Sequence, residues 1–194
     1  MSKLYFKYGT MNSSKTANLL MTKHNYEEQG MEVFLIKPAI DTRDVGVIKS
    51  RIGLEAKCVN FSEDASIYDV LTNAGYSVNH LPNVLIVDES QFCTSKQVEE
   101  LLNISIQIPV LCYGLKTDSH TKLFPGSQRL LELAESIQEI KTICTCGKKA
   151  TINARINDKG FVVLNAPQID IGGNDKYKPM CKECFVLNGG SFSE

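Results

Sequence analysis

The sequence predicts an α/β protein with an open, mostly parallel sheet and a small metal-binding subdomain near its C-terminus. Two patterns lead to this fold class. Short apolar runs flank a helix-forming stretch in the first part of the chain, and four cysteines crowd into the last quarter. With 194 residues the chain can bury about 70% of its unfolded surface, so one sizeable core needs no disulfides.

Several short apolar segments, bounded by turn or polar residues, are typical of strands buried on both faces of a sheet. Between the first two lies a helix-forming stretch with apolar residues near its middle and Gly30 as its expected C-cap. This order of strand, loop, helix and strand is the βαβ unit of a parallel sheet. The expected strands are Leu4–Tyr8, 32–36, Val84–Val87, 108–112 and 136–142, and the expected helices cover 13–29 and 127–134.

Composition and charge exclude several classes of protein. Apolar residues make up 43% and charged residues 22%, which argues against collagen-like, coiled-coil and disordered chains. The 21 Lys and Arg nearly balance the 22 Asp and Glu, and a net charge of −1 attracts neither nucleic acid nor an anionic membrane. No apolar run has the length of a signal-peptide core or a membrane span. We therefore expect a cytoplasmic protein whose seven cysteines are thiols or metal ligands.

The segment between the first expected strand and the first expected helix has the composition of a phosphate-binding loop. Backbone N–H groups at a helix N-terminus face an anion, Lys15 can reach the β- and γ-phosphates, and the Thr16 hydroxyl can join the Mg²⁺ shell. Ser14 stands where the motif G-x-x-x-x-G-K-[ST] has its second glycine, so a capped helix with a surface lysine explains this segment equally well. The segment comprises Gly9, Thr10, Met11, Asn12, Ser13, Ser14, Lys15 and Thr16.

The apolar run Val84–Val87 ends in two adjacent acids, Asp88 and Glu89, which is the form of a Walker B segment. A carboxylate at the C-terminal end of a parallel strand lies near the phosphate loop, so we expect Asp88 to hold Mg²⁺. Two solvated acids at a strand end are the alternative. Both features in this order favour a P-loop NTPase-like nucleotide-binding domain over residues 1–142.

Phosphoryl transfer also needs a base or a water-positioning group near the acceptor, and Glu89 stands next to the expected metal ligand. Arg43 follows the second expected strand, with Asp41 two residues before it. An arginine there can stabilise charge on the transferring phosphoryl group. On pattern alone, a solvated loop pair explains these two residues equally well.

The cysteines of the last quarter form two close pairs, Cys144 with Cys146 and Cys181 with Cys184. Four thiolates can close a tetrahedral structural zinc site, and a short Gly-rich segment gains folding free energy from such a metal. Plain buried thiols are the alternative, because the first pair is one residue tighter than usual. We expect residues 143–194 to form a zinc-binding subdomain. The cysteines expected in the core instead are Cys58, Cys93 and Cys112.

Taken together, the ordered motifs resemble the cytosolic type II thymidine kinases found in many bacteria. The resemblance covers nearly the whole chain and includes residues 9–16, 41–43, 88–92, 112–118, 123–127 and 171–177. It implies transfer of the γ-phosphate of ATP to the 5′-hydroxyl of thymidine or deoxyuridine, giving dTMP in nucleotide salvage for DNA synthesis. It also implies a homotetramer, a structural zinc and feedback inhibition by dTTP.

Roles for individual residues follow from their places in the matching motifs. Glu89 would be the general base on the 5′-hydroxyl, and Arg43 would lie on the phosphoryl path. The nucleotide would be bound by residues 9–16 with Asp88, Glu89, Ser90 and Gln91, and Mg²⁺ by Thr16 and Asp88. The thymidine site would comprise Met11, Asp41, Leu115, Phe124, Ile169, Asp170, Ile171, Gly172, Gly173 and Tyr177.

Two positions depart from the family pattern, since Ser14 replaces the usual loop glycine and Ser119 stands where many relatives carry phenylalanine. Neither departure removes a side-chain group that would take part in the chemistry. A module that only binds or hydrolyses nucleotide would explain Lys15 and Asp88 but leaves Phe124 without a purpose. A zinc-ribbon module that binds nucleic acid would explain the cysteines, but the near-zero net charge and the lack of tryptophan argue against it.

Overall fold

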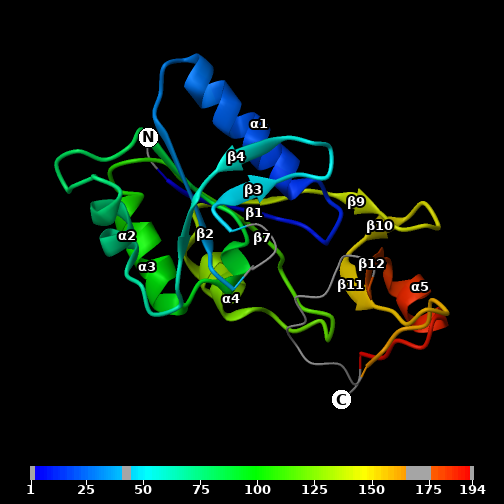
Figure 1. Cartoon of the computed structure of the whole chain (residues 1–194). Helices are drawn as coiled ribbons and strands as arrows, with labels where there is room; N and C mark the ends of the chain where they lie inside the picture. Colours follow the sequence, from blue (N-terminus) through cyan, green and yellow to red (C-terminus); the bar gives the residue numbers. More distant parts are fainter. Residues whose placement is uncertain (1–2, 41–44, 165–175, 193–194) are drawn as a thin grey trace.

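The computed structural model describes residues 3–40, 45–164 and 176–192. Its central feature is a six-stranded sheet in the order β5-β2-β6-β7-β1-β8, in which all neighbouring strands run parallel (Figure 1). The predicted α/β class is confirmed, and β7 separates β1 from β6. The strands are β1 (Leu4–Tyr8), β2 (Val33–Pro38), β5 (Val59–Phe61), β6 (Val84–Val87), β7 (Val110–Gly114) and β8 (Ser136–Glu139).

Helices cover both faces of this sheet, because successive strand residues point to opposite sides. In β6, Leu85 and Val87 face one hydrophobic cluster, whereas Val84 and Ile86 face another. The first cluster is covered by α2 (Ile67–Asn73), α3 (Ser95–Ile104) and α4 (Pro125–Leu133), and the second by α1 (Lys15–Glu28) with the hairpin of β3 (Val47–Lys49) and β4 (Glu55–Lys57).

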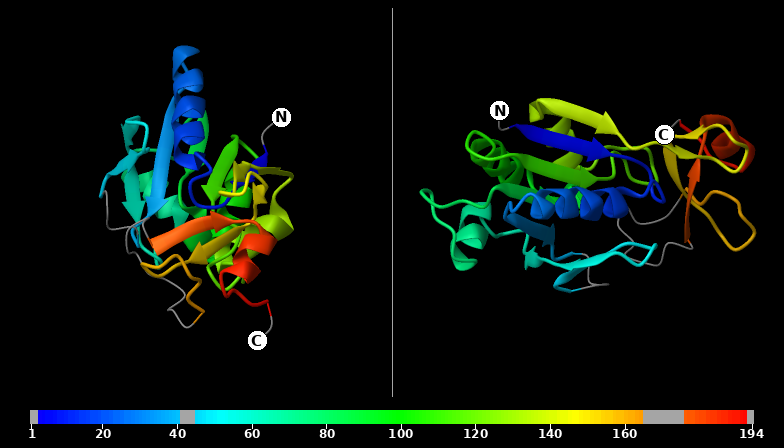
Figure 2. Two further views of the ribbon diagram at one scale, coloured as in Figure 1. Left: turned by 90° about the vertical axis from the view of Figure 1, so that its right-hand side faces the viewer. Right: turned by 90° about the horizontal axis from the view of Figure 1, so that it is seen from above.

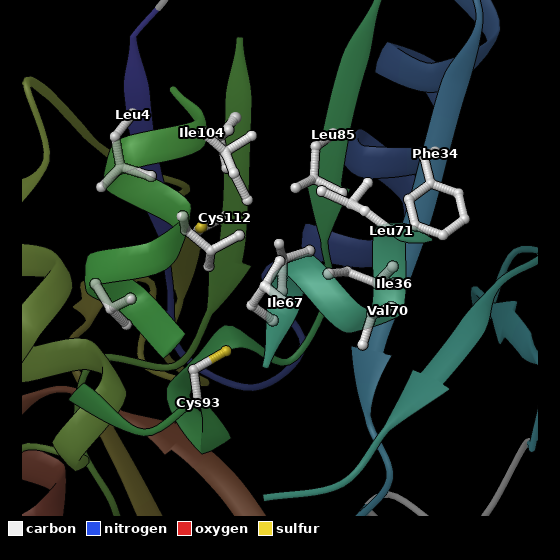
Figure 3. Close-up of a cluster of buried hydrophobic side chains, with 14 of the residues drawn as sticks. Leu4, Phe34, Ile36, Ile67, Val70, Leu71, Leu85, Cys93, Ile104 and Cys112 are labelled. Carbon is white, nitrogen blue, oxygen red and sulfur yellow. The ribbon is translucent and has the colours of Figure 1, made fainter. Parts of the chain in front are cut away.

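Figure 3 shows how the first cluster is filled. Leu71 of α2 lies next to Leu85 and Phe34 on the strands, and Ile104 of α3 lies near Cys112. These buried aliphatic and aromatic groups pack the helices against the sheet, and burial of such side chains stabilises the fold by about 1.5–3 kcal/mol each. The sheet is therefore a rigid support for the loops that leave its ends.

Several predicted elements differ at their ends. The strands predicted at 32–36 and 108–112 are Val33–Pro38 and Val110–Gly114, and the helix predicted at 127–134 begins at Pro125. The strand predicted at 136–142 ends at Glu139, because its partner β1 ends at Tyr8, directly opposite. The elements α2, α3, β3, β4 and β5 were not predicted.

The C-terminal part of the chain forms a separate group of small elements, which we call the cysteine lobe. It comprises β9 (Thr142–Ile143), β10 (Lys149–Ala150), β11 (Ile152–Arg155), β12 (Tyr177–Met180) and α5 (Lys182–Leu187). Two antiparallel ladders, β9 with β10 and β11 with β12, pack with α5 around their own small cluster. Figure 2 shows that β1 points toward this lobe, which therefore lies at the carboxyl end of the sheet.

Within the described ranges, no helix combines the length and the apolar content needed to cross a membrane.

Candidate active site

The loop between β1 and α1 has an unusual backbone. Asn12 and Ser14 adopt left-handed conformations with φ of 64° and 58°, which costs a residue with a β-carbon roughly 1–2 kcal/mol. Ser14 makes no capping hydrogen bond with its side chain, so the alternative of an ordinary Ser-capped helix does not apply. A β-carbon on Gly9 would lie 2.3 Å from Ser13 Oγ and 2.5 Å from the Ile140 carbonyl oxygen, so only glycine fits there.

Lys15 folds back over this loop instead of extending into solvent. Its Nζ donates to the Thr10 carbonyl at 2.7 Å and lies 3.4 Å from Ser13 Oγ. Burial lowers the pKa of Lys15, while the negative charges of Glu89 and Asp88 raise it in part. The half-buried lysine therefore lies in the electrostatic field of both acids and is not a fully exposed surface side chain. Thr16 follows as the second residue of α1.

Asp88 lies at the end of β6 and is only 5% exposed. Burial and the neighbouring Glu89 raise its pKa to about 7, despite a hydrogen bond from the Glu89 N–H and the positive charges of Lys15 and Lys37. A divalent cation would favour the ionised form of such a carboxyl group, and carboxylate oxygens are the ligands that Mg²⁺ prefers. The buried acid therefore fits a magnesium ligand, and the alternative of a solvated acid is wrong.

The backbone turns at Glu89, which has a φ of 50°, and the 3₁₀ turn η1 (Ser90–Phe92) follows. Glu89 Oε2 accepts a hydrogen bond of 2.6 Å from Gln91 Nε2, and Gln91 Oε1 accepts one of 2.9 Å from the Leu115 N–H. Gln91 is 1% exposed. Ser90 Oγ donates to the Tyr113 carbonyl at 3.0 Å. Both side chains thus fasten the acidic turn to β7 and the loop after it.

The predicted thymidine-site residues within the described ranges come from separate elements. Leu115 follows β7, and its carbonyl accepts a hydrogen bond from Ser127 Oγ at 2.5 Å. Phe124 precedes α4, is 6% exposed and packs edge-to-face on Phe92 with ring centroids 5.6 Å apart. Tyr177 opens β12, where the Arg155 guanidinium lies 6.0 Å from the centre of its ring.

Ser119, the second departure from the family pattern, is buried in the turn after Asp118. Its hydroxyl has no hydrogen-bond partner among the residues that the structure describes. Asp118 Oδ1 orders the same turn by accepting from the His120 and Lys122 N–H groups, at 2.9 Å each.

Asn153 is a site residue that the sequence analysis missed. It lies in β11, and its Oδ1 accepts a hydrogen bond of 2.7 Å from the Met11 N–H in the loop between β1 and α1. Its Nδ2 donates to the Thr117 carbonyl at 2.9 Å. The signal in the sequence is a lone polar residue between Ile152 and Ala154, both of which are buried.

The four clustered cysteines come together as predicted. Their Sγ atoms all lie within 4.8 Å of one another, and those of Cys146 and Cys181 are 3.6 Å apart. A tetrahedral zinc with Zn–S bonds of about 2.3 Å separates its sulfur atoms by about 3.8 Å. The cluster, completed by Cys144 and Cys184, is therefore compatible with a structural zinc. Cys93 and Cys112 are buried in the core as expected, whereas Cys58 is half-buried beside the second cluster.

The remaining predicted site residues lie outside the described residues. They are Asp41, Arg43, Ile169, Asp170, Ile171, Gly172 and Gly173.

Comparisons with known proteins identify the family of this chain. The family model described as thymidine kinase matches residues 2–185. The thymidine kinase of Zymomonas mobilis is 44% identical over 192 residues, covering 96% of this chain and 97% of that protein. The thymidine kinase of Listeria monocytogenes serotype 4b is 45% identical, with coverages of 96% and 97%. The thymidine kinase of Legionella pneumophila strain Paris is 45% identical, with coverages of 94% and 88%.

Among solved structures, the X-ray structure of the Legionella pneumophila ATPase DotB matches with a TM-score of 0.41 and 15% identity. The match covers 76% of this chain and 43% of that one, a likeness too distant to carry over any property. The matches to thymidine kinases, by contrast, extend over nearly the full length of both chains at about 45% identity. The chain therefore belongs to the thymidine kinase family.

Proposed function

We propose that this enzyme transfers the γ-phosphate of ATP to the 5′-hydroxyl of thymidine, with deoxyuridine as a second acceptor. The observation that carries this proposal is the placement of Lys15, Asp88 and Glu89 at one edge of the sheet. Both carboxylates act on the charge of the lysine, so a phosphate-binding cation, a buried acid and a second acid share one site. Family membership supports the same reaction.

On the nucleotide side, the N–H groups of residues 9–14, with Lys15 and Thr16, would bind the phosphates of ATP. Asp88 and the Thr16 hydroxyl would hold Mg²⁺, which neutralises negative charge on the phosphates when it is bound. Lys15 already contacts two groups of the loop, so a phosphate would replace the Thr10 carbonyl as its partner. Ser90 and Gln91 would support this side through their contacts with β7 and Leu115, rather than touch the nucleotide.

On the acceptor side, Glu89 would take the proton from the 5′-hydroxyl. The oxygen of that hydroxyl would attack the γ-phosphorus as ADP leaves. The hydrogen bond from Gln91 Nε2 to Glu89 Oε2 helps to fix this carboxylate at the end of β6, and a general base must be held in position in this way. Met11, Leu115, Phe124 and Tyr177 would contact thymine. Asp41, Arg43 and residues 169–173 would complete the site, with Arg43 on the phosphoryl path.

Further properties are proposed from the family resemblance and the cysteine chemistry. Cys144, Cys146, Cys181 and Cys184 would hold one structural zinc, and the chain would divide into domains at residues 1–142 and 143–194. Free cysteines fit a reducing cytoplasm. We also infer a homotetramer and feedback inhibition by dTTP, which sedimentation analysis and a dTTP titration of the activity would test. No nucleic acid or membrane partner is proposed.

Incubation of the enzyme with Mg-ATP and a panel of nucleosides tests the proposal. We expect thymidine monophosphate as the main product, and ADP release that depends on thymidine. Lys15→Ala should lower kcat/KM by at least about 100-fold, because the charge that meets the transferring phosphate is lost. Lys23→Ala, further along α1 where the lysine pairs with Glu27, is the matched control and should retain parent activity. ADP release without any nucleoside product would instead indicate a nucleotide-hydrolysing module.

A further inference from the structure

The side chain of Asn153 lies where the phosphate loop, the loop after β7 and the cysteine lobe meet. It is 3% exposed, and both of its hydrogen bonds go to backbone atoms, the Met11 N–H at 2.7 Å and the Thr117 carbonyl at 2.9 Å. A carboxamide can accept with one atom and donate with the other from a single planar group. Asparagine therefore suits this position better than a carboxylate or a hydroxyl.

The loop from Leu115 to Thr117 is fastened at both ends by a buried carboxamide. Gln91 Oε1 binds the Leu115 N–H, and Asn153 Nδ2 binds the Thr117 carbonyl. Because Gln91 also donates to Glu89, the acid at the end of β6 and the phosphate loop are joined through this one loop. The chain of contacts runs through Glu89, Gln91, Leu115, Thr117, Asn153 and Met11.

Other contacts also join the C-terminal part of the chain to this edge, among them one of 2.9 Å between His120 Nε2 and the Leu164 carbonyl. Thr142 Oγ1 lies 3.4 Å from the Asn12 carbonyl, and Lys149 forms an exposed ion pair with Glu139. Beside Asn153 lies a pocket of about 20 Å³, whose lining includes Thr10 of the phosphate loop, Lys116 of the loop after β7 and Thr151 next to β11. The two hydrogen bonds of Asn153 therefore bridge the two loops beside this small cavity.

We propose that Asn153 is a positioning residue that sets the phosphate loop against the Leu115–Thr117 loop and couples both to the folded cysteine lobe. The inference rests on the proposed phosphotransfer function. Met11 precedes Asn12, one of the two left-handed residues of the loop, and strained backbone persists only where its surroundings hold it. Asn153 lies in β11, which pairs with β12. Ile152 of β11 lies opposite Met180 of β12, and Cys181 follows Met180 directly in the chain.

Two variants distinguish the contributions of the two hydrogen bonds that Asn153 makes. Asn153→Ala removes both, whereas Asn153→Asp keeps an acceptor for the Met11 N–H and places an oxygen opposite the Thr117 carbonyl. Asn83→Ala is the matched control, because Asn83 Oδ1 also accepts a backbone N–H, that of Glu32 at 2.7 Å, at the amino end of the sheet. The readouts are amide hydrogen exchange at Met11, Mg-ATP affinity, steady-state kinetics, zinc content and melting temperature.

We expect Asn153→Ala to speed exchange of the Met11 amide by about 10-fold or more, because its hydrogen bond is lost. Its kcat/KM for ATP should fall by about 10–100-fold, as expected for a misplaced reacting group, with zinc content and melting temperature near those of the parent. Asn153→Asp should keep Met11 protected while kcat/KM for thymidine falls. Asn83→Ala should change none of these quantities.

Two results would overturn the proposal. One is parent-like Met11 exchange and kinetics in Asn153→Ala. The other is loss of zinc and of melting temperature in both Asn153 variants, which would make the residue a structural element of the lobe. If the parent protein transfers no phosphate to any nucleoside, the proposed function fails, but Met11 exchange and Mg-ATP affinity still decide the role of Asn153.

Discussion

The sheet and the cysteine lobe reach order by different means. The sheet buries aliphatic and aromatic side chains on both faces, in two clusters to which strands and helices all contribute. The lobe has only a small hydrophobic cluster, and two of the residues in it are Cys144 and Cys181. A segment with so little apolar core depends on cross-links or a metal. We therefore expect the order of the sheet to be independent of a metal, and the order of the lobe to depend on one bound by its four cysteines.

The largest expected effect comes from removing a ligand of the lobe. Cys181→Ser should reduce zinc from about one per chain to none and unfold the lobe, since structural zinc contributes on the order of 10 kcal/mol in small zinc domains. The sheet should keep its own cooperative melting transition, and thymidine binding should weaken. Elemental analysis, limited proteolysis and calorimetry measure these changes.

Cys58→Ser is the control for that experiment, because Cys58 is half-buried beside the sheet and outside the four-cysteine cluster. If the lobe stayed folded in Cys181→Ser, its order would not depend on a metal, and the proposed difference between the lobe and the sheet would be wrong. The same conclusion would follow from zinc-free parent protein purified without chelator.

A smaller effect concerns the free energy of unfolding that is lost by burying Asp88 at the end of β6. The pKa of Asp88 is about 7 in the folded protein and near 3.8 in the unfolded chain, so ionisation favours unfolding between these values. Without nucleotide or Mg²⁺, Asp88→Asn should match the parent in stability near pH 4. It should exceed the parent by about 1–4 kcal/mol at pH 8. Urea unfolding at both pH values measures this difference.

In the Asp88 experiment the pH dependence is the informative part. A stability difference between Asp88→Asn and the parent that is the same at both pH values would contradict a buried, hard-to-ionise acid. Asp69→Asn, in the first turn of α2, provides a control far from the site.

The smallest effect concerns the phosphate loop itself. Ser14→Gly should stabilise the protein by about 0.5–1 kcal/mol, because glycine adopts the left-handed backbone without the β-carbon penalty. Ser66→Gly is a matched control of opposite sign, since Ser66 has a φ of −75° and its side chain caps α2. A destabilised Ser14→Gly protein would show that contacts of the Ser14 side chain outweigh the penalty of its left-handed backbone.

The parts of the fold that the sequence predicted are those with an unambiguous pattern. β1 and β6 match their predicted bounds because a strand buried on both faces is a short apolar run between polar residues. α3 was missed although Thr94 and Gln97 form a capping box, a signal visible in the sequence. The β3–β4 hairpin was also missed, because its strands are only three residues long, too short to show a periodic pattern.

The residues of the candidate site also differ in whether the sequence could predict them. Asp88, Lys15 and the cysteines could be predicted because their chemistry depends on residue type and local spacing. Asn153 could not, because its partners are backbone atoms of Met11 and Thr117, which lie 142 and 36 residues away in the chain. A side chain that recognises main-chain groups leaves no mark in the sequence around those groups. The supporting role of Gln91 escaped prediction for the same reason.

The central claim is that the chemistry belongs to the sheet edge, with Glu89 as the base. The most direct test is Glu89→Gln, with kcat and thymidine affinity measured on the same preparation. The amide is nearly isosteric but cannot take a proton, so kcat should fall by about 10²–10⁴-fold while thymidine and ATP still bind. A parent-like kcat would contradict the base assignment, and lost thymidine binding with no intrinsic rate defect would make Glu89 a positioning residue instead.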